Sequence, residues 1–220
     1  VDTMTGLATT WNPNASANVA VIQVAGGIIY VGGNFTNMNG TTRNRLAAFD
    51  QTSGTLTSWN PNVSSQVYAI IVTGSTVYFA GSFSSVGGTP RQNVAAIDTA
   101  GTLMATFNPS VNDTVRAMAY SGTNLYIGGN FDQVNGSTRT NVAELDPTTG
   151  SPSNWDPVIG GGSIYSMALS GNTLYISGTF DTVNGNVRER IASLSTLSDT
   201  GSGIAPNVNS IANTIAVSGS

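Results

Sequence analysis

Four arginines recur at a nearly fixed spacing and are the side chains best suited to binding an anion. They are Arg43, Arg91, Arg139 and Arg188. A guanidinium group matches the geometry of a carboxylate or sulfate, so a ring of four arginines would bind such groups. In a second interpretation, each arginine donates hydrogen bonds to carbonyl groups of the loop that precedes it. The repetition favours this second interpretation, because binding sites usually break a symmetry.

A second candidate set occupies one repeated position, at the entry to the first strand predicted in each repeat. The residues there are Ala20, Tyr68, Arg116, Tyr165 and Asn213. The two tyrosine rings and the guanidinium group are suited to stacking against a sugar ring or a partner's side chain. In the alternative, they fill a channel or a seam between repeats. We treat Tyr68, Arg116, Tyr165 and Asn213 as candidate binding residues.

Carboxylates offer weaker candidates. Asp132 and Asp181 lie in equivalent loops, and Ca²⁺ takes about 6–8 oxygen ligands. No Asp-x-Asp-x-Asp spacing is present, so calcium is a minor expectation and no other cofactor is expected. Glu144 stands where other repeats have Ala or Ser. A repeated aspartate precedes a glycine by three or four residues and is expected to cap the turn; these are Asp2, Asp50, Asp98 and Asp146, and the fourth repeat has Ser195 instead.

Composition disfavours catalysis. The 220 residues include 7 Lys or Arg, all of them Arg, 11 Asp or Glu, no His and no Cys. The usual general bases and covalent nucleophiles are therefore missing. Without Cys there is neither a disulfide framework nor a zinc site. We expect no enzyme, and a glycan-active enzyme that uses paired carboxylates remains a minor alternative.

The same composition limits the partners. The net charge is −4 with no basic cluster, which disfavours nucleic acid. No run of about 18 apolar residues is present, so no membrane span is expected. The first residues lack a basic segment followed by an apolar one, so we expect that any signal peptide has been removed.

The elements that position these residues follow from an internal repeat of about 48 residues. One aromatic series recurs two residues before a proline, and it consists of Trp11, Trp59, Phe107 and Trp155. Two further series are Tyr30, Tyr78, Tyr126 and Tyr175, and Phe35, Phe83, Phe131 and Phe180. In the second repeat, β-branched and aromatic runs predict four strands at Val67–Val72, Val77–Phe83, Arg91–Asp98 and Leu103–Phe107. A polar loop from Ser84 to Pro90 separates the second from the third.

Four short antiparallel strands per repeat are typical of a β-propeller blade. The recurring rings would fill the gaps between blades. The first residues align with the end of the third strand of a repeat, and this alignment predicts complete blades at 14–61, 62–109, 110–157 and 158–206. A split fifth blade would take its outer strand from 1–13 and its inner strand from 207–220. Its middle strands would come from a longer array or from another copy. Both candidate sets are expected on the face that carries the long loops.

Some segments resemble the delta-60-type β-propeller repeat of secreted and surface bacterial proteins, and a fungal cortical-marker propeller family has similar units. They are Leu125–Phe131, Arg43–Asp50 and Trp59–Asn62. The resemblance implies an extracellular or cell-surface recognition or scaffold module without catalytic residues. Its partner would be a protein or a glycan at the cell surface. The alternative is a structural subunit of an extracellular filament or surface layer that assembles through the incomplete blade by strand exchange.

Overall fold

The computed structural model describes residues 4–7, 9–198, 201–202, 206 and 208–218. Within them every regular element is a strand, so no helix is present that could cross a membrane. Three long strands form each of four successive antiparallel sheets, which confirms the all-β architecture. Sheet by sheet, they are β1 (Val19–Ala25), β2 (Ile28–Gly33) and β5 (Leu46–Asp50); β6 (Val67–Thr73), β7 (Thr76–Gly81) and β10 (Val94–Asp98); β11 (Val115–Tyr120), β12 (Leu125–Gly129) and β15 (Val142–Leu145); and β17 (Ile164–Ser170), β18 (Thr173–Gly178) and β21 (Ile191–Ser195). We call them blades 1 to 4.

The outer, fourth strand of each blade is shorter than predicted. In blade 2, the run expected from Leu103 to Phe107 makes one bridge, between Leu103 and Ile97. Blade 3 pairs only through Pro152, which has no N–H group to continue a ladder. Blade 4 alone adds a fourth strand, β22 (Gly201–Ser202). The third strand of blade 2 starts at Val94 instead of Arg91, since Asn93 has a φ of 64°.

The predicted polar loops between the second and third strands are in fact hairpins. They are β3 (Asn37–Met38) and β4 (Thr41–Thr42), β8 (Ser85–Val86) and β9 (Thr89–Pro90), β13 (Gln133–Val134) and β14 (Ser137–Thr138), and β19 (Thr182–Val183) and β20 (Asn186–Val187). In blade 4 the hairpin also pairs with β16 (Ile159–Gly160). Asn39 and Gly40 both have positive φ, as a two-residue hairpin turn requires. Met38 is buried, so the hairpin also adds to the core.

Aromatic rings occupy the seams between blades, as predicted. Trp59 meets Tyr30 edge to face at 5.3 Å between ring centroids, and its side chain is 7% exposed. The equivalent pairs are Phe107 with Tyr78 at 5.2 Å and Trp155 with Tyr126 at 5.5 Å. Each seam therefore holds one wedge ring that joins the apolar faces of two consecutive blades.

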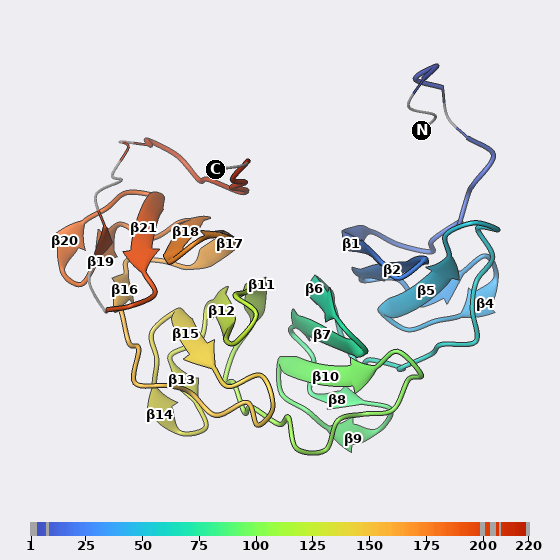
Figure 1. Ribbon diagram of the computed structural model, residues 1–220, viewed down its shortest axis with the longest axis horizontal. Coiled ribbons are helices and arrows are strands. Elements are labelled where there is room, and N and C mark those ends of the chain that lie inside the picture. The colour runs from blue at the N-terminus through green and yellow to red at the C-terminus, as the bar shows by residue number, and fades with distance from the viewer. Residues whose placement is uncertain (1–3, 8, 199–200, 203–205, 207, 219–220) are drawn as a thin grey trace.

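The four blades form an open arc (Figure 1), with the inner strands β1, β6, β11 and β17 around a central space and the hairpins at the outside. Residues 208–218 form no strand, although they align with an inner strand. Ala212 N donates to Gly178 O and Ile215 N donates to Ser166 Oγ, so the segment lies against blade 4 without a sheet partner. The outer strand expected within 1–13 is also unformed in its described part, and residues 1–3 and 8 lie outside the described residues.

Aspartates cap the turns that follow the third strands. Asp50 Oδ1 accepts hydrogen bonds from the backbone N–H groups of Thr52 and Ser53, and Asp98 Oδ1 accepts one from Thr102. Asp146 does the same with Thr148 and Thr149. These backbone hydrogen bonds hold the pKa of each carboxyl below its ordinary value.

A depressed pKa in the folded state predicts a loss of stability in acid. The contribution of Asp50, Asp98 and Asp146 is complete above the unfolded pKa of about 3.9, and it disappears as the pH falls through the lower folded values. Asn keeps the acceptor oxygen but does not titrate. We therefore expect the free energy of unfolding to fall less in a triple Asp→Asn variant than in the wild type when the pH is lowered from neutral to below the folded pKa values. Urea unfolding at both pH values measures this fall. An identical fall in both proteins would contradict the capping role.

Candidate functional site

A central cavity of about 480 Å³ is lined by all five inner segments. These are the four inner strands, β1, β6, β11 and β17, and the segment around Asn213 and Thr214. The volume lies within the usual range of ligand pockets. The lining is mixed, with small and apolar residues from each inner strand beside a few polar groups. We call this space the central channel.

The polypeptide aims three long side chains into the channel by a repeated backbone irregularity. The register shifts at Tyr68 between Val67 and Ala69, and equivalent shifts occur at Arg116 and Tyr165. A bulge inserts one residue that has no partner on the neighbouring strand and redirects its side chain. The three bulged residues come from three consecutive blades and meet in the channel.

Arg116 is fixed by three contacts. Its Cζ atom lies over the ring of Tyr68 and over the ring of Tyr165, at 5.1 Å from each centroid. Its Nε donates to Asn130 Oδ1 at 3.0 Å. Both cation–π contacts are within the distance at which such attraction is significant. The guanidinium group is therefore held in one place before any ligand arrives.

The edge of this guanidinium group is available to an acceptor. Among the residues that the structure describes, no carboxylate pairs with Arg116 and no group accepts from its Nη1 or Nη2 atoms. The two cation–π contacts do not place an oxygen acceptor on Nη1 or Nη2, so these N–H groups can still bind the two oxygens of a carboxylate. The channel is thus suited to one planar anionic group.

The structure brings together one of the two predicted sets. Tyr68, Arg116, Tyr165 and Asn213 all line the central channel, with Asn213 on the segment beside blade 4. The repeated arginines do not join them. They follow the hairpins, which stand at the outside of the arc in Figure 1, one in each blade.

The repeated arginines bind their own blades. Each donates through Nη1 to the carbonyl of the preceding residue, namely Thr42, Pro90, Thr138 and Val187. Three also donate through Nη2 to the outer segment of the same blade, at Thr57, Met104 and Ser153. These hydrogen bonds agree with the favoured interpretation, in which each arginine donates to carbonyl groups of the loop before it, and three of the four also close their own hairpin onto their own outer segment.

The carboxylate candidates are spread over the molecule. Asp132 accepts a hydrogen bond from Asn112 Nδ2 at 2.5 Å in blade 3, while Asp181 belongs to blade 4. The described part of the chain contains no group of three or more His, Cys, Asp or Glu that would hold a metal. Calcium binding by either aspartate stays a prediction. Glu144 is buried in the third seam, where it accepts hydrogen bonds from Tyr126, Asn124 and Ser153.

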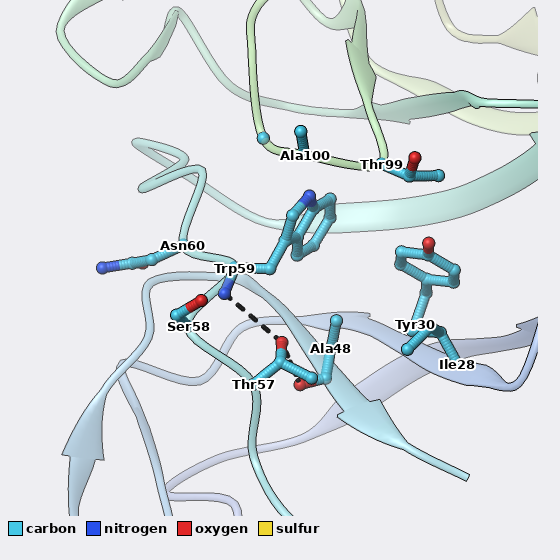
Figure 2. A pocket seen from close by; sticks show the side chains of 10 residues that line it. Ile28, Tyr30, Ala48, Thr57, Ser58, Trp59, Asn60, Thr99 and Ala100 are labelled. Carbon is cyan, nitrogen blue, oxygen red and sulfur yellow. Dashed lines mark hydrogen bonds between the residues drawn. The ribbon is translucent and has the colours of Figure 1, made fainter.

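A second kind of pocket lies at the seams (Figure 2). The pocket at the first seam has a volume of about 430 Å³, and in it the Trp59 indole points toward the turn at Thr99 and Ala100 with Tyr30 beside it. Thr57 Oγ1 accepts from the backbone N–H of Trp59 and donates to Ala48 O. Similar pockets surround Trp11 and Trp155. Their recurrence at one repeat position indicates that they are a consequence of how the ring packs against the nearby turn.

Sequence reasoning missed Asn130 as the residue that orients Arg116. The two are 14 residues apart, and they meet because β11 and β12 pair in a hairpin with a bulge at Arg116. Blade 1 has Asn34 at the equivalent position beside Ala20, so the asparagine by itself gives no signal. Only the strand register could have identified it.

Comparisons with known proteins agree with this architecture. A family profile described as "Domain of unknown function (DUF5122) beta-propeller" matches residues 27–56 and 124–152. A search of curated proteins found no match. The crystal structure of the computationally designed Ika4 protein is similar, with a TM-score of 0.53 and 12% identity over 82% of this chain and 92% of that one.

The crystal structure of the WD40 β-propeller domain of Doa1 is also similar, with a TM-score of 0.61 and 14% identity. That match covers 90% of this chain, which spans 57% of the length of that domain. At such identities the likeness shows the fold alone. With the four stacked blades and the family profile in two of the repeats, these matches show that the chain is a β-propeller repeat protein.

Proposed function

We propose that this protein is a non-enzymatic recognition module, extracellular or at the cell surface, that binds a carboxylate-bearing protein or glycan in its central channel. The observation that carries this proposal is Arg116, which is held between Tyr68 and Tyr165 without an acidic partner among the described residues. A cation held in advance loses little entropy when it binds an anion. Propeller scaffolds of this kind present a rigid site built from several blades.

The distribution of ionisable groups supports a binding role over catalysis. The sequence contains no His, Cys or Lys. The repeated aspartates are engaged in turns, and Glu144 accepts three hydrogen bonds in a seam. The extracellular location rests on the resemblance to secreted and surface propeller repeats.

Titration calorimetry with a tri-glutamate peptide and with a trigalacturonate tests the proposal, and tri-glutamine and a neutral trisaccharide serve as uncharged controls. We expect one of the two anionic probes to bind, which identifies the partner as peptide or glycan. Arg116→Gln should weaken that binding at least about tenfold, because a hydrogen bond to a charged group contributes about 1.5–3 kcal/mol.

The matched control is Arg188→Gln, which removes the same charge from the outside of blade 4. It should leave the affinity within about a factor of two, because exposed charges beyond a Debye length of about 8 Å are screened at physiological salt. Absence of binding by both anionic probes, or an equal loss in the two variants, would refute the proposal.

A further inference from the structure

The seam between blades 3 and 4 contains a buried carboxylate that the other blades lack. Glu144 is 8% exposed. The residues at the equivalent position of blades 1, 2 and 4 are Ala48, Ala96 and Ser193. Glu144 lies directly opposite Tyr126 on the neighbouring strand, and such cross-strand partners share one face of a sheet. That face packs against blade 4, so the carboxylate belongs to the seam.

Neutral donors hold this carboxylate in place. Its Oε1 accepts a hydrogen bond from Asn124 Nδ2 and one from the Tyr126 hydroxyl, and its Oε2 accepts one from Ser153 Oγ. In blade 1 the hydroxyl equivalent to that of Ser153 is Thr57 Oγ1, which donates to the carbonyl of Ala48 (Figure 2). The third seam is therefore built differently at this one position.

One acceptor position of the carboxylate is still available. A carboxylate has about four of them, and hydrogen bonds from described residues fill three. No arginine pairs with Glu144 among the described residues, and the sequence contains no Lys or His. Arg139 binds the Ser153 carbonyl and pairs with Asp156 at 3.6 Å. A buried charge without an opposite charge is costly, so a cation supplied from outside would relieve that cost.

A pocket of about 320 Å³ gives a ligand access to Glu144. Ser153, Trp155, Thr196 and Leu197 also line it. Leu197 is 76% exposed and Glu144 only 8%, so the carboxylate lies at the inner end and the leucine at the mouth. The volume is at the lower end of the usual range for ligand pockets. The repeated packing of the ring accounts for the pocket, but it does not account for an acid inside it.

We propose that this third-seam pocket binds a protonated primary amine, with its ammonium group on Glu144 and its alkyl stem along Leu197. An ammonium group has three N–H donors, and Oε2 can accept one of them. Thr196 Oγ1 can accept another, because it donates its own hydrogen to Asn172 O. The aromatic ring of Trp155 in the lining favours a cation further.

The lining is better suited to an organic cation than to a metal ion. Glu144 is its only carboxylate among the described residues, which contain no group of three or more His, Cys, Asp or Glu. Ca²⁺ takes about 6–8 oxygen ligands, which this lining does not offer. The amine must come from another molecule, since the chain has no Lys. The site therefore extends the proposed function, because it takes a cation in a seam while the channel takes an anion.

Nitrogen–proton correlation spectra of residues 1–220 during titration with butylammonium chloride test the proposal. The reporter is the Nε1–H signal of Trp155, which donates to the carbonyls of Ser195 and Ser198 and is identified by its loss in Trp155→Phe. We expect a saturable shift with butylammonium and none with 1-butanol or potassium chloride at the same concentrations. A doubly capped lysine serves as a second amine, and tighter binding of it than of butylammonium would point to a protein as the source of the amine.

Glu144→Ala should weaken the binding of butylammonium at least about tenfold, because it removes the charged acceptor. The variant should fold, since blades 1 and 2 have alanine at this position, and thermal unfolding checks this. If it unfolds, Glu144→Gln takes its place. The matched control is Glu189→Gln, which changes the glutamate between β20 and β21 that does not line the pocket, and it should leave the affinity unchanged.

Three results would overturn the proposal. They are the absence of a saturable shift with butylammonium, an equal shift with 1-butanol or potassium chloride, and an unchanged affinity in the folded Glu144 variant. None of them bears on carboxylate binding in the channel, which is measured with anionic probes and with Arg116→Gln.

Discussion

Replacing Trp59 with Ala should lower the free energy of unfolding by about 3–5 kcal/mol, which is the usual effect of removing a large buried ring. Trp59 fills the first seam, where it meets Tyr30 and reaches Asp98 of blade 2. Its removal leaves a cavity between two rigid sheets that cannot collapse without changing the angle between blades. The loss therefore combines the transfer of the ring with the cavity that remains.

Trp11→Ala is the matched control, because Trp11 holds the same repeat position but is packed only on Phe49 among the described rings. Its loss should be clearly smaller, since 38% of the side chain is already in solvent. Both variants would be measured by urea unfolding of residues 1–220. Equal losses in the two variants would show that the rings do not act as wedges between blades.

Gly81→Ala should destabilise the fold by at least about 3 kcal/mol, more than an ordinary overpacked core position. A Cβ on Gly81 would stand 1.9 Å from the carbonyl oxygen of Gln66 and 3.1 Å from the Cα of Val67. The same oxygen accepts a hydrogen bond from Ser82 N at 3.0 Å. The backbone would have to move, and this hydrogen bond would be strained or lost.

The site is affected as well, because this contact borders the bulge that aims Tyr68 into the channel. The equivalent glycines Gly33, Gly129 and Gly178 meet backbone carbonyls at 2.3, 2.1 and 2.0 Å. Gly74→Ala is the control, since it has a φ of +55° but open space around its Cβ, and it should cost only about 1–2 kcal/mol. Urea unfolding measures both, and a Gly81→Ala variant no less stable than Gly74→Ala would contradict the close approach.

Sequence periodicity predicted the features that recur in every blade. A ring such as Trp59 repeats because each seam needs one wedge, and an aspartate such as Asp98 repeats because each turn has the same N–H groups to cap. The inner strands were also readable, since a run such as Val67–Val72 is apolar on both faces. The side-chain types at each position determine these features locally, so the pattern of a single repeat shows them and its recurrence confirms them.

Features that depend on contacts between distant segments could not be predicted. The polar run from Ser84 to Pro90 forms a hairpin by local pairing around Gly87 and Gly88, a pair of residues that could have indicated it, whereas the bridge from Val86 to Val63 depends on a distant segment. The arginines donate to carbonyls of the loop before them, as the favoured interpretation predicted, but three of them also bind carbonyls of the outer segment, which the sequence does not place. The meeting of Tyr68, Arg116 and Tyr165 was proposed from the repeat position, yet the bulges that produce it leave no mark in the residue types.

Amide chemical-shift mapping with the tri-glutamate peptide or the trigalacturonate is the most direct test of the central claim that the channel is the recognition site. We predict that the anionic probe shifts the signals of Tyr68, Arg116, Tyr165 and their neighbours on the inner strands, and that Arg116→Gln abolishes those shifts. Shifts confined to the hairpins at the outside of the arc, or no shifts with either probe, would contradict it.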